Sequence, residues 1–323
     1  MPSTLGGTMN RGPEDRQASE DSTSHNRIPR QFATFAVILL VSLIAFRNLI
    51  SSLARLSLHD ERYSQILLIP AITAGLIYWD RDNIFKRGTW CRACGFLLLL
   101  LGAIEGFFVG TNSEPGMPTS TLFLSVLLLV ALWATAFALC FGIATLRRAA
   151  FPWCFLFLVA PLPRQVLDAV VAALQAGSAE VSFVLFKAVG MPVLRDGLLF
   201  ALPGVSIEIA KECSGIRSSM SLFLVSVLVS HLFLRLNWTR FVLCVLTIPI
   251  VIFKNALRIV GLSWLGVNVT SEFFHGTLHH QYGGLSVSLV SLLLQALVFA
   301  ALWKAEHSRR ALTCSSNGTK TID

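Results

Sequence analysis

The sequence contains few charged residues, and this shortage excludes most soluble folds. Only 14% of the 323 residues are Asp, Glu, Lys or Arg, whereas soluble domains contain about a quarter. Apolar residues make up 54% of the chain, and several uninterrupted apolar runs approach the roughly 20 residues that cross a bilayer. We therefore predict an all-α polytopic membrane protein.

Closely spaced cysteine pairs are also scarce. Among seven cysteines, only Cys91-Arg-Ala-Cys94 forms a CxxC, and no second pair or nearby histidine completes a zinc site. The sequence assigns these two cysteines no role. Three others, Cys140, Cys154 and Cys244, lie in apolar runs, where cysteine packs as a small hydrophobe. The pattern argues against a disulfide scaffold.

An early apolar leader is missing as well. Residues 1–31 are polar and rich in Ser, Gly, Pro and Arg, which is typical of a disordered tail and not of a signal peptide. The first apolar run is therefore expected to be a retained helix. The predicted organisation is a cytoplasmic tail at 1–31, one transmembrane catalytic domain at 32–302 and a basic cytoplasmic tail at 303–323.

Apolar runs follow one another along the rest of the chain. They cover approximately 32–56, 65–79, 95–109, 119–146, 149–162, 164–190, 216–234, 241–265 and 283–302. The net charge of +8 comes from basic residues between these runs, as in the cytoplasmic loops of membrane proteins, so we expect no nucleic-acid partner.

The basic clusters also predict the topology. Those at 81–92, 147–148, 235–240 and 304–310 are placed in the cytoplasm with both termini, so the number of spans is even. The run at 164–190 contains four charged residues and is predicted to be an amphipathic helix at the outer face. This leaves about eight transmembrane helices.

A short segment before Cys213 has a different pattern. In "MPVLRDGLLFALPGVSIEIA" (191–210), prolines and glycines separate short alternating runs, which predicts a small hairpin or extended piece.

This topology places three reactive residue types at the same face. Cys213 precedes the span that starts near 216, Asn255 and Arg258 lie late in the next span, and the following loop contains His279 and His280. A thiol becomes nucleophilic beside a base or a positive charge, histidine transfers protons near neutral pH, and arginine can stabilise an oxyanion. Together they indicate acyl transfer or proteolysis through a thioester.

Other interpretations of these residues stay open. Cys213 could be an inert thiol at a helix end, and Arg258 could reach the interface without a catalytic role. His275 and His279 have the i, i+4 spacing of a helical metal site, with only Glu272 nearby. We expect neither a metal nor a cofactor.

Several motifs together resemble the exosortase/archaeosortase family. These motifs are "YSQILLIPAITAGLIYW", the extended segment, "ECSGIRS", "NALRI" and "HHQYGG", in this order over roughly residues 60 to 302. The resemblance implies a membrane cysteine protease or transpeptidase. Such an enzyme cleaves C-terminal sorting tails built from a Pro-Glu-Pro-like motif, a transmembrane helix and basic residues.

The resemblance also implies residue roles. Cys213 corresponds to the nucleophile, Arg258 to the arginine and His279 to the histidine, while a His-x-x-Gly-Gly spacing would instead select His280. Supporting or substrate-binding roles are predicted for Asn255, Ser214 and Gly215.

Two positions depart from the family pattern. Gln65 replaces a histidine that is common in the second-helix motif, and Gly284 replaces a tryptophan. No role is assigned to Gln65. The family pattern does not predict how the chain packs around position 284.

The expected enzyme lies in a bacterial inner membrane with its active site at the periplasmic face. Its expected partners are sorting tails, the bilayer and an envelope glycan or lipid acceptor. The alternative belongs to another functional class: a polysaccharide-export or lipid-linked-sugar transport or assembly protein without thiol catalysis. A weaker alternative is a membrane thiol-disulfide oxidoreductase.

Overall fold

The structure, a computed structural model, describes most of the chain and is mainly helical with one small sheet. The described residues are 27–86, 92–111, 118–203, 205–209, 216–268 and 289–308. The chain divides into two compact units. The first unit contains residues 1–59 and 66–161, and the second contains residues 60–65 and 162–323. The prediction of one catalytic domain at 32–302 is not tested by this division.

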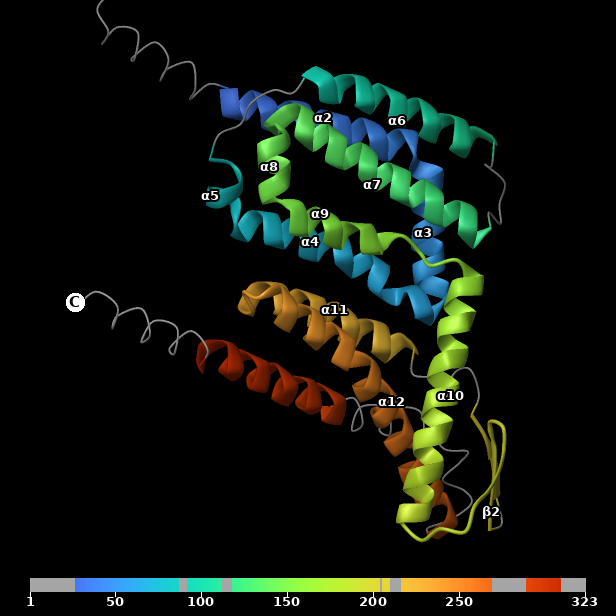
Figure 1. The fold of residues 1–323 in the computed structure, drawn as a ribbon. Helices are drawn as coiled ribbons and strands as arrows, with labels where there is room; N and C mark the ends of the chain where they lie inside the picture. The colour runs from blue at the N-terminus through green and yellow to red at the C-terminus, as the bar shows by residue number, and fades with distance from the viewer. Residues whose placement is uncertain are drawn as a thin grey trace, which may run out of the picture. The chain divides into compact units, whose positions relative to one another are not determined.

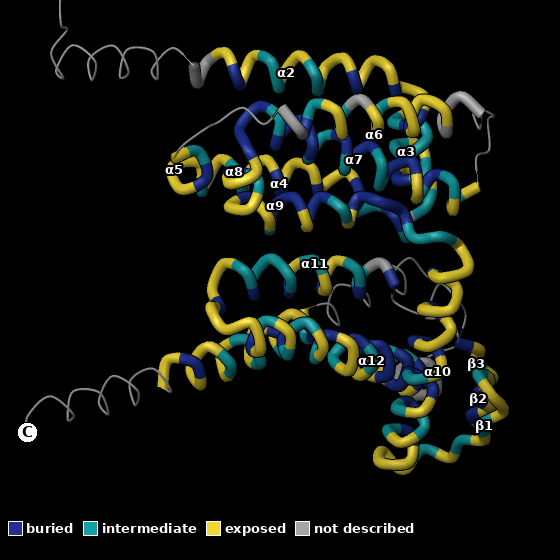
Figure 2. The backbone as a smooth tube through the Cα atoms, turned by 45° about the horizontal axis from the view of Figure 1, so that its top comes forward, coloured by how far each residue is buried: buried dark blue, intermediate teal, exposed yellow. Residues whose placement is uncertain are grey.

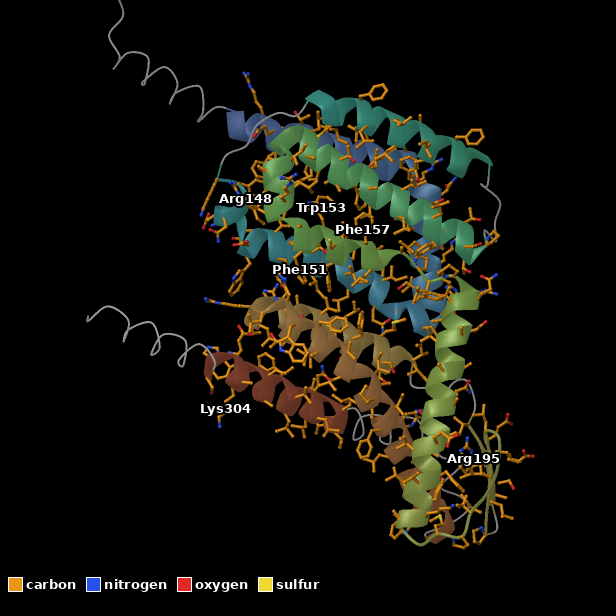
Figure 3. The ribbon with its side chains drawn as sticks, viewed as in Figure 1. Arg148, Phe151, Trp153, Phe157, Arg195 and Lys304 are labelled. Atoms are coloured by element: carbon orange, nitrogen blue, oxygen red, sulfur yellow. The ribbon has the colours of Figure 1, made fainter. Side chains whose placement is uncertain are left out.

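The first unit is helical and is arranged around one central helix. Its elements are α2 (Arg27–Ala45), α3 (Arg47–His59), α4 (Leu68–Trp79), α5 (Arg81–Ile84), α6 (Arg92–Thr111), α7 (Thr119–Phe141), α8 (Ile143–Arg148), α9 (Ala150–Leu156) and η2 (Phe157–Val159). Helix α7 packs against both α2 and α6 (Figure 1). Its buried Phe137 and Phe141 contact other aromatic rings, including Trp153 of α9 at 5.4 Å between centroids (Figure 3).

Two predicted apolar runs of this unit are each broken into two helices. The run at 32–56 becomes α2 and α3, which meet at a bend of 74°. The run at 119–146 is interrupted at Gly142, whose φ of 89° lies in the left-handed region that favours glycine. Helix α7 therefore ends there and α8 begins in a new direction.

The described part of the second unit contains four α-helices and a small sheet, and these elements lie on both sides of the Cys213 segment in the chain. Its elements are η1 (Glu61–Leu67, of which residues 61–65 belong to this unit), α10 (Arg164–Ala188), β1 (Leu194–Asp196), β2 (Leu199–Leu202), β3 (Val205–Glu208), α11 (Ile216–Phe233), α12 (Asn237–Asn268) and a last helix, Leu289–Ser308. Helix α12 packs against both α10 and α11 (Figure 1). Where α12 runs beside α10, many of its residues are buried (Figure 2).

The predicted extended segment is confirmed as a small antiparallel sheet in the order β1-β2-β3. Leu194 pairs with Ala201 and Phe200 pairs with Ile207. Gly197, with a φ of 60°, allows the tight turn between the first two strands. Arg195 of β1 donates to Glu180 of α10 at 2.8 Å, which attaches the sheet to that helix (Figure 3).

A compact apolar cluster lies between the sheet and its two helices. Its buried members are Ala179, Phe186, Phe200, Leu202, Ile209, Ile259 and Val260. Because β2, α10 and α12 all contribute side chains, this cluster fixes the sheet against the second half of α12. The end of β3 is therefore held beside the helix that contains Arg258.

The described residues include four helices that are long and apolar enough to cross a membrane, or five when the bent pair α2–α3 is counted as one span. This agrees with a polytopic membrane protein, and eight spans stay a prediction. Helix α10 is among the four, so its predicted position along the outer face also stays a prediction.

The close approach of α10 to α12 depends on Gly177. A Cβ at this position would lie 3.0 Å from Cδ1 of Ile252. We expect Gly177→Leu to lower the free energy of unfolding by about 1–3 kcal/mol, because the larger side chain forces the helices apart. Thermal unfolding of the purified protein in detergent would measure this.

Gly261→Leu is the matched control, because a Cβ there would have no atom of the described residues within 4 Å. Equal losses of stability in the two variants would contradict the close packing of α10 on α12.

Candidate active site

Helix α12 contains the predicted Asn255 and Arg258. Asn255 is 2% exposed, and its Nδ2 donates to Ser178 Oγ of α10 at 3.1 Å. The asparagine thus forms a hydrogen bond between two helices, which positions the neighbouring turn of α12. Arg258 follows within the same turn and is half-buried. It forms no hydrogen bond or ion pair with any residue that the structure describes.

Cys213, Ser214 and Gly215 lie outside the described residues, as do His279 and His280. The structure therefore does not test whether these side chains meet. It does describe the elements on both sides of the segments that contain them.

The last described residue before Cys213 is Ile209, directly after β3, and it is firmly held. Ile209 is 2% exposed and belongs to the apolar cluster with Ile259 and Val260. Its backbone N–H donates to Leu198 O at 3.1 Å, and its carbonyl accepts from Gln175 Nε2 at 2.8 Å. The chain therefore enters the Cys213 segment beside the turn of α12 that contains Arg258.

The element after Cys213 is α11, and it is attached to the same part of α12. Lys254, which is 5% exposed, donates from Nζ to Ser218 Oγ at 2.5 Å. Lys254 and Arg258 are one turn apart on α12, so they lie on the same side of that helix. Ile209 and Ser218, on either side of the segment 210–215, thus both contact the stretch of α12 from 254 to 260.

The last helix runs in the same direction as α11. Gln295 Nε2 donates to Ser226 Oγ at 2.6 Å and to Thr247 Oγ1 at 3.1 Å. Further along, the buried Glu306 carboxylate accepts from Arg235 N and from Thr239 Oγ1, each at 3.1 Å.

These bonds determine which ends of the helices come together. Because 295 lies beside 226 and 306 beside 235, the first residues of the last helix are level with the first turns of α11. The histidine-containing segment therefore enters the last helix at the end of the bundle where the Cys213 segment enters α11.

Gln65 of η1 contacts this end of α11 as well. Gln65 Nε2 donates to Ser221 Oγ at 3.0 Å, and Ser221 is one turn from Ser218. Gln65 therefore occupies a position beside the start of α11, although the sequence assigned it no role.

A polar cluster next to Gln65 attaches η1 to the start of α10. Arg62 pairs with Asp60 at 2.7 Å, and Tyr63 OH donates to Leu162 O at 2.9 Å. The hydrogen bonds from Arg62 hold the pKa of the Asp60 carboxyl below its usual value, despite the opposing effect of partial burial. The carboxylate therefore stays ionised at neutral pH and remains paired with Arg62.

Two residues of this region were missed from the sequence alone. Lys254 stands four residues before Arg258 in an otherwise apolar run, and this spacing alone could have indicated a cationic pair. Gln175 gives no comparable signal, because its partner is a backbone carbonyl 34 residues away. Metal-binding clusters of three or more His, Cys, Asp or Glu are absent from the described part of the chain, which does not include His275 and His279.

Comparison with known proteins identifies the family. The family model for the transmembrane exosortases matches residues 51–297. The match covers well over half of the chain, so the protein belongs to the transmembrane exosortase family and is a multi-pass membrane protein. Comparisons with curated proteins and with solved structures gave no match.

The Gln175–Ile209 hydrogen bond allows a direct test of how the Cys213 segment is anchored. We expect Gln175→Leu to lower the free energy of unfolding by about 1–3 kcal/mol, because the buried Ile209 carbonyl loses its side-chain donor. Denaturation in detergent, followed by tryptophan fluorescence, would measure the change.

Ser182→Ala serves as the matched control on the same helix. The Ser182 hydroxyl is buried and has no hydrogen-bond partner among the described residues, so its removal should change stability little. A Gln175→Leu variant as stable as the control would contradict the anchoring role.

Proposed function

We propose that this exosortase is an integral-membrane cysteine protease or transpeptidase that cleaves C-terminal sorting tails of exported proteins. The tails consist of a Pro-Glu-Pro-like motif and a transmembrane helix. The observation that supports this best concerns the described elements around the predicted site. Ile209 and Ser218, on either side of the Cys213 segment, contact the part of α12 that contains Arg258, and the last helix begins at the same end of the second unit as α11.

Chain connectivity supports a role for Cys213 at this end. Three peptide units separate Cys213 from Ile216, the first residue of α11, and they span at most about 11 Å. Ser218, near the start of α11, is bonded to Lys254. This short connection supports a location of the thiol on the side of the second unit where Lys254 and Arg258 lie.

The proposed reaction begins with proton transfer from the Cys213 thiol to His279, with His280 as the alternative base. The thiolate attacks the scissile carbonyl carbon, and Arg258 stabilises the negative oxygen of the tetrahedral intermediate. The C–N bond then breaks, and the protonated histidine gives its proton to the departing amine. A thioester joins the remaining substrate to Cys213.

Water or a nucleophile of an envelope glycan or lipid then attacks the thioester carbonyl. The histidine accepts the proton of the attacking group and returns one to the cysteine sulfur. Water gives hydrolysis, whereas the glycan or lipid nucleophile gives transpeptidation. Asn255 has a supporting role, because its bond to Ser178 positions the Arg258 turn against α10.

The proposed location is the bacterial inner membrane, with the active site at the periplasmic face and both termini in the cytoplasm. Arg235 and Lys304 lie at the end of the second unit opposite the proposed site, which agrees with the preference of basic residues for the cytoplasmic side.

The first test measures tail processing in cells. A reporter protein ending in Pro-Glu-Pro, an apolar helix and an Arg-rich tip should be cleaved by the wild type. Cys213→Ala and Cys213→Ser should reduce cleavage at least about a thousand-fold, because the nucleophile is lost. Immunoblotting of the reporter would follow the cleavage.

Cys244→Ala is the matched control, since Cys244 lies within α12 and has no proposed role. Full processing by both Cys213 variants would exclude the thioester mechanism. Unchanged Cys213 variants together with lost polysaccharide export in an Arg258 variant would favour the transport alternative.

A second test locates the thiol. In a variant whose other six cysteines are replaced, a membrane-impermeant thiol reagent applied to spheroplasts should label Cys213, because the reactive form is an exposed thiolate. Replacing His279 by alanine should slow this labelling severalfold. The rate of labelling can be measured by mass spectrometry of the purified protein.

Labelling that occurs only after the membrane is permeabilised would place Cys213 at the cytoplasmic face and contradict the proposed topology. Equal rates with and without His279 would remove that residue from the mechanism.

A further inference from the structure

Lys254 is a buried cation without an anionic partner in the described structure. Its side chain is 5% exposed, and its only hydrogen bond there joins Nζ to Ser218 Oγ. An ammonium group has three N–H donors, so two of them have no acceptor among the described residues. No described acidic side chain forms an ion pair with Lys254.

Arg258 makes this arrangement more unfavourable. It lies one turn from Lys254 on the same side of α12, and like charges at this spacing repel each other. A buried, uncompensated charge in an apolar helix is also costly. Two neighbouring cations in this setting are best explained by an anion that binds to them.

The position of Lys254 limits what this anion can be. Ser218 is near the start of α11, directly after the Cys213 segment, so the ammonium lies beside the proposed cleavage site. Positions four residues apart on a helix are separated by about 6 Å along its axis. Residues of an extended peptide advance about 3.3 Å each. A carboxylate one or two residues from the scissile bond would therefore reach Lys254 while Arg258 contacts the reacting carbonyl.

We propose that Lys254 binds the acidic side chain of the recognition motif in the sorting tail and thereby selects which tails are cleaved. This inference rests on the function proposed above. Lys254 pairs with the substrate carboxylate, Ser218 orients the ammonium, and Arg258 keeps its separate role at the oxyanion.

The test compares two reporter tails that differ only in the motif, Pro-Glu-Pro and Pro-Gln-Pro. The wild type should cleave the Glu tail about ten- to a hundred-fold faster, the factor that a hydrogen bond to a charged group contributes. In Lys254→Met this ratio should fall to about one, mainly because the Glu tail is cleaved more slowly. Lys254→Arg should retain a clear preference for the Glu tail.

The Met variant is suited to this test because it keeps an unbranched side chain and removes an uncompensated buried charge, so it should accumulate in the membrane like the wild type. Lys254→Gln provides a second neutral variant. Lys304→Met is the control, because Lys304 is an exposed lysine of the last helix (Figure 3). It should leave the ratio unchanged.

Several results would overturn the assignment. If both neutral variants still cleave the Glu tail faster than the Gln tail, a group other than Lys254 binds the carboxylate. An equal slowing of both tails in the neutral variants would show that Lys254 acts on the thiol or on folding. A Glu212→Gln variant with the same loss of preference would identify Glu212 as the partner of Lys254.

The same experiment distinguishes a failure of the proposed function from a failure of the Lys254 assignment. A wild type that cleaves neither tail would overturn the sorting reaction and this assignment with it. A wild type that cleaves both tails at the same rate would overturn only the role of Lys254.

Discussion

Polar groups buried in an apolar helix bundle need partners within the protein, and in the second unit many of these partners are on α11. Its serines bond to Lys254 of α12, to Gln65 of η1 and, together with Thr247, to Gln295 of the last helix. Each bond fixes how far one helix is shifted along another. The alignment of the helix ends therefore follows from a few hydroxyl-centred contacts.

This alignment explains how a reaction site can form at the end of a bundle. The segment with Cys213 and the segment with the histidines both lead into helices whose first turns are level with each other. The sheet and its apolar cluster hold the preceding element against α12. The proposed function requires the reactive groups of these segments and of α12 to meet in this region, where water and acceptor molecules would approach from the membrane surface.

In the proposed reaction, the two cations of α12 have separate roles. Arginine suits a developing oxyanion because its planar group presents several donors in a fixed arrangement. Lysine provides a single compact charge that can pair with one carboxylate. Their spacing of one helical turn is comparable to one or two residues of an extended substrate, so a single helix face could contact both the scissile bond and the motif.

Much of the secondary structure could be predicted from local patterns. The short extended segment before Cys213 was confirmed as β1 to β3, because prolines and glycines at turns leave a direct signal. The runs at 216–234 and 241–265 became α11 and α12. The bend between α2 and α3 was not predicted, because no proline or glycine stands at that point and the polar pair Arg47-Asn48 alone does not specify a bend.

The sequence by itself determined the membrane class, the positions of most helices, the extended segment and the motifs that lead to the exosortase family. Each of these depends on residues that are close together in the chain. Only the tertiary structure decided that Ser218 meets Lys254, that Gln175 holds the carbonyl of Ile209, and that α11 and the last helix begin at the same level. These contacts join residues 34 to 69 positions apart, and they depend on how the helices pack, which the hydrophobic pattern of any single helix does not specify.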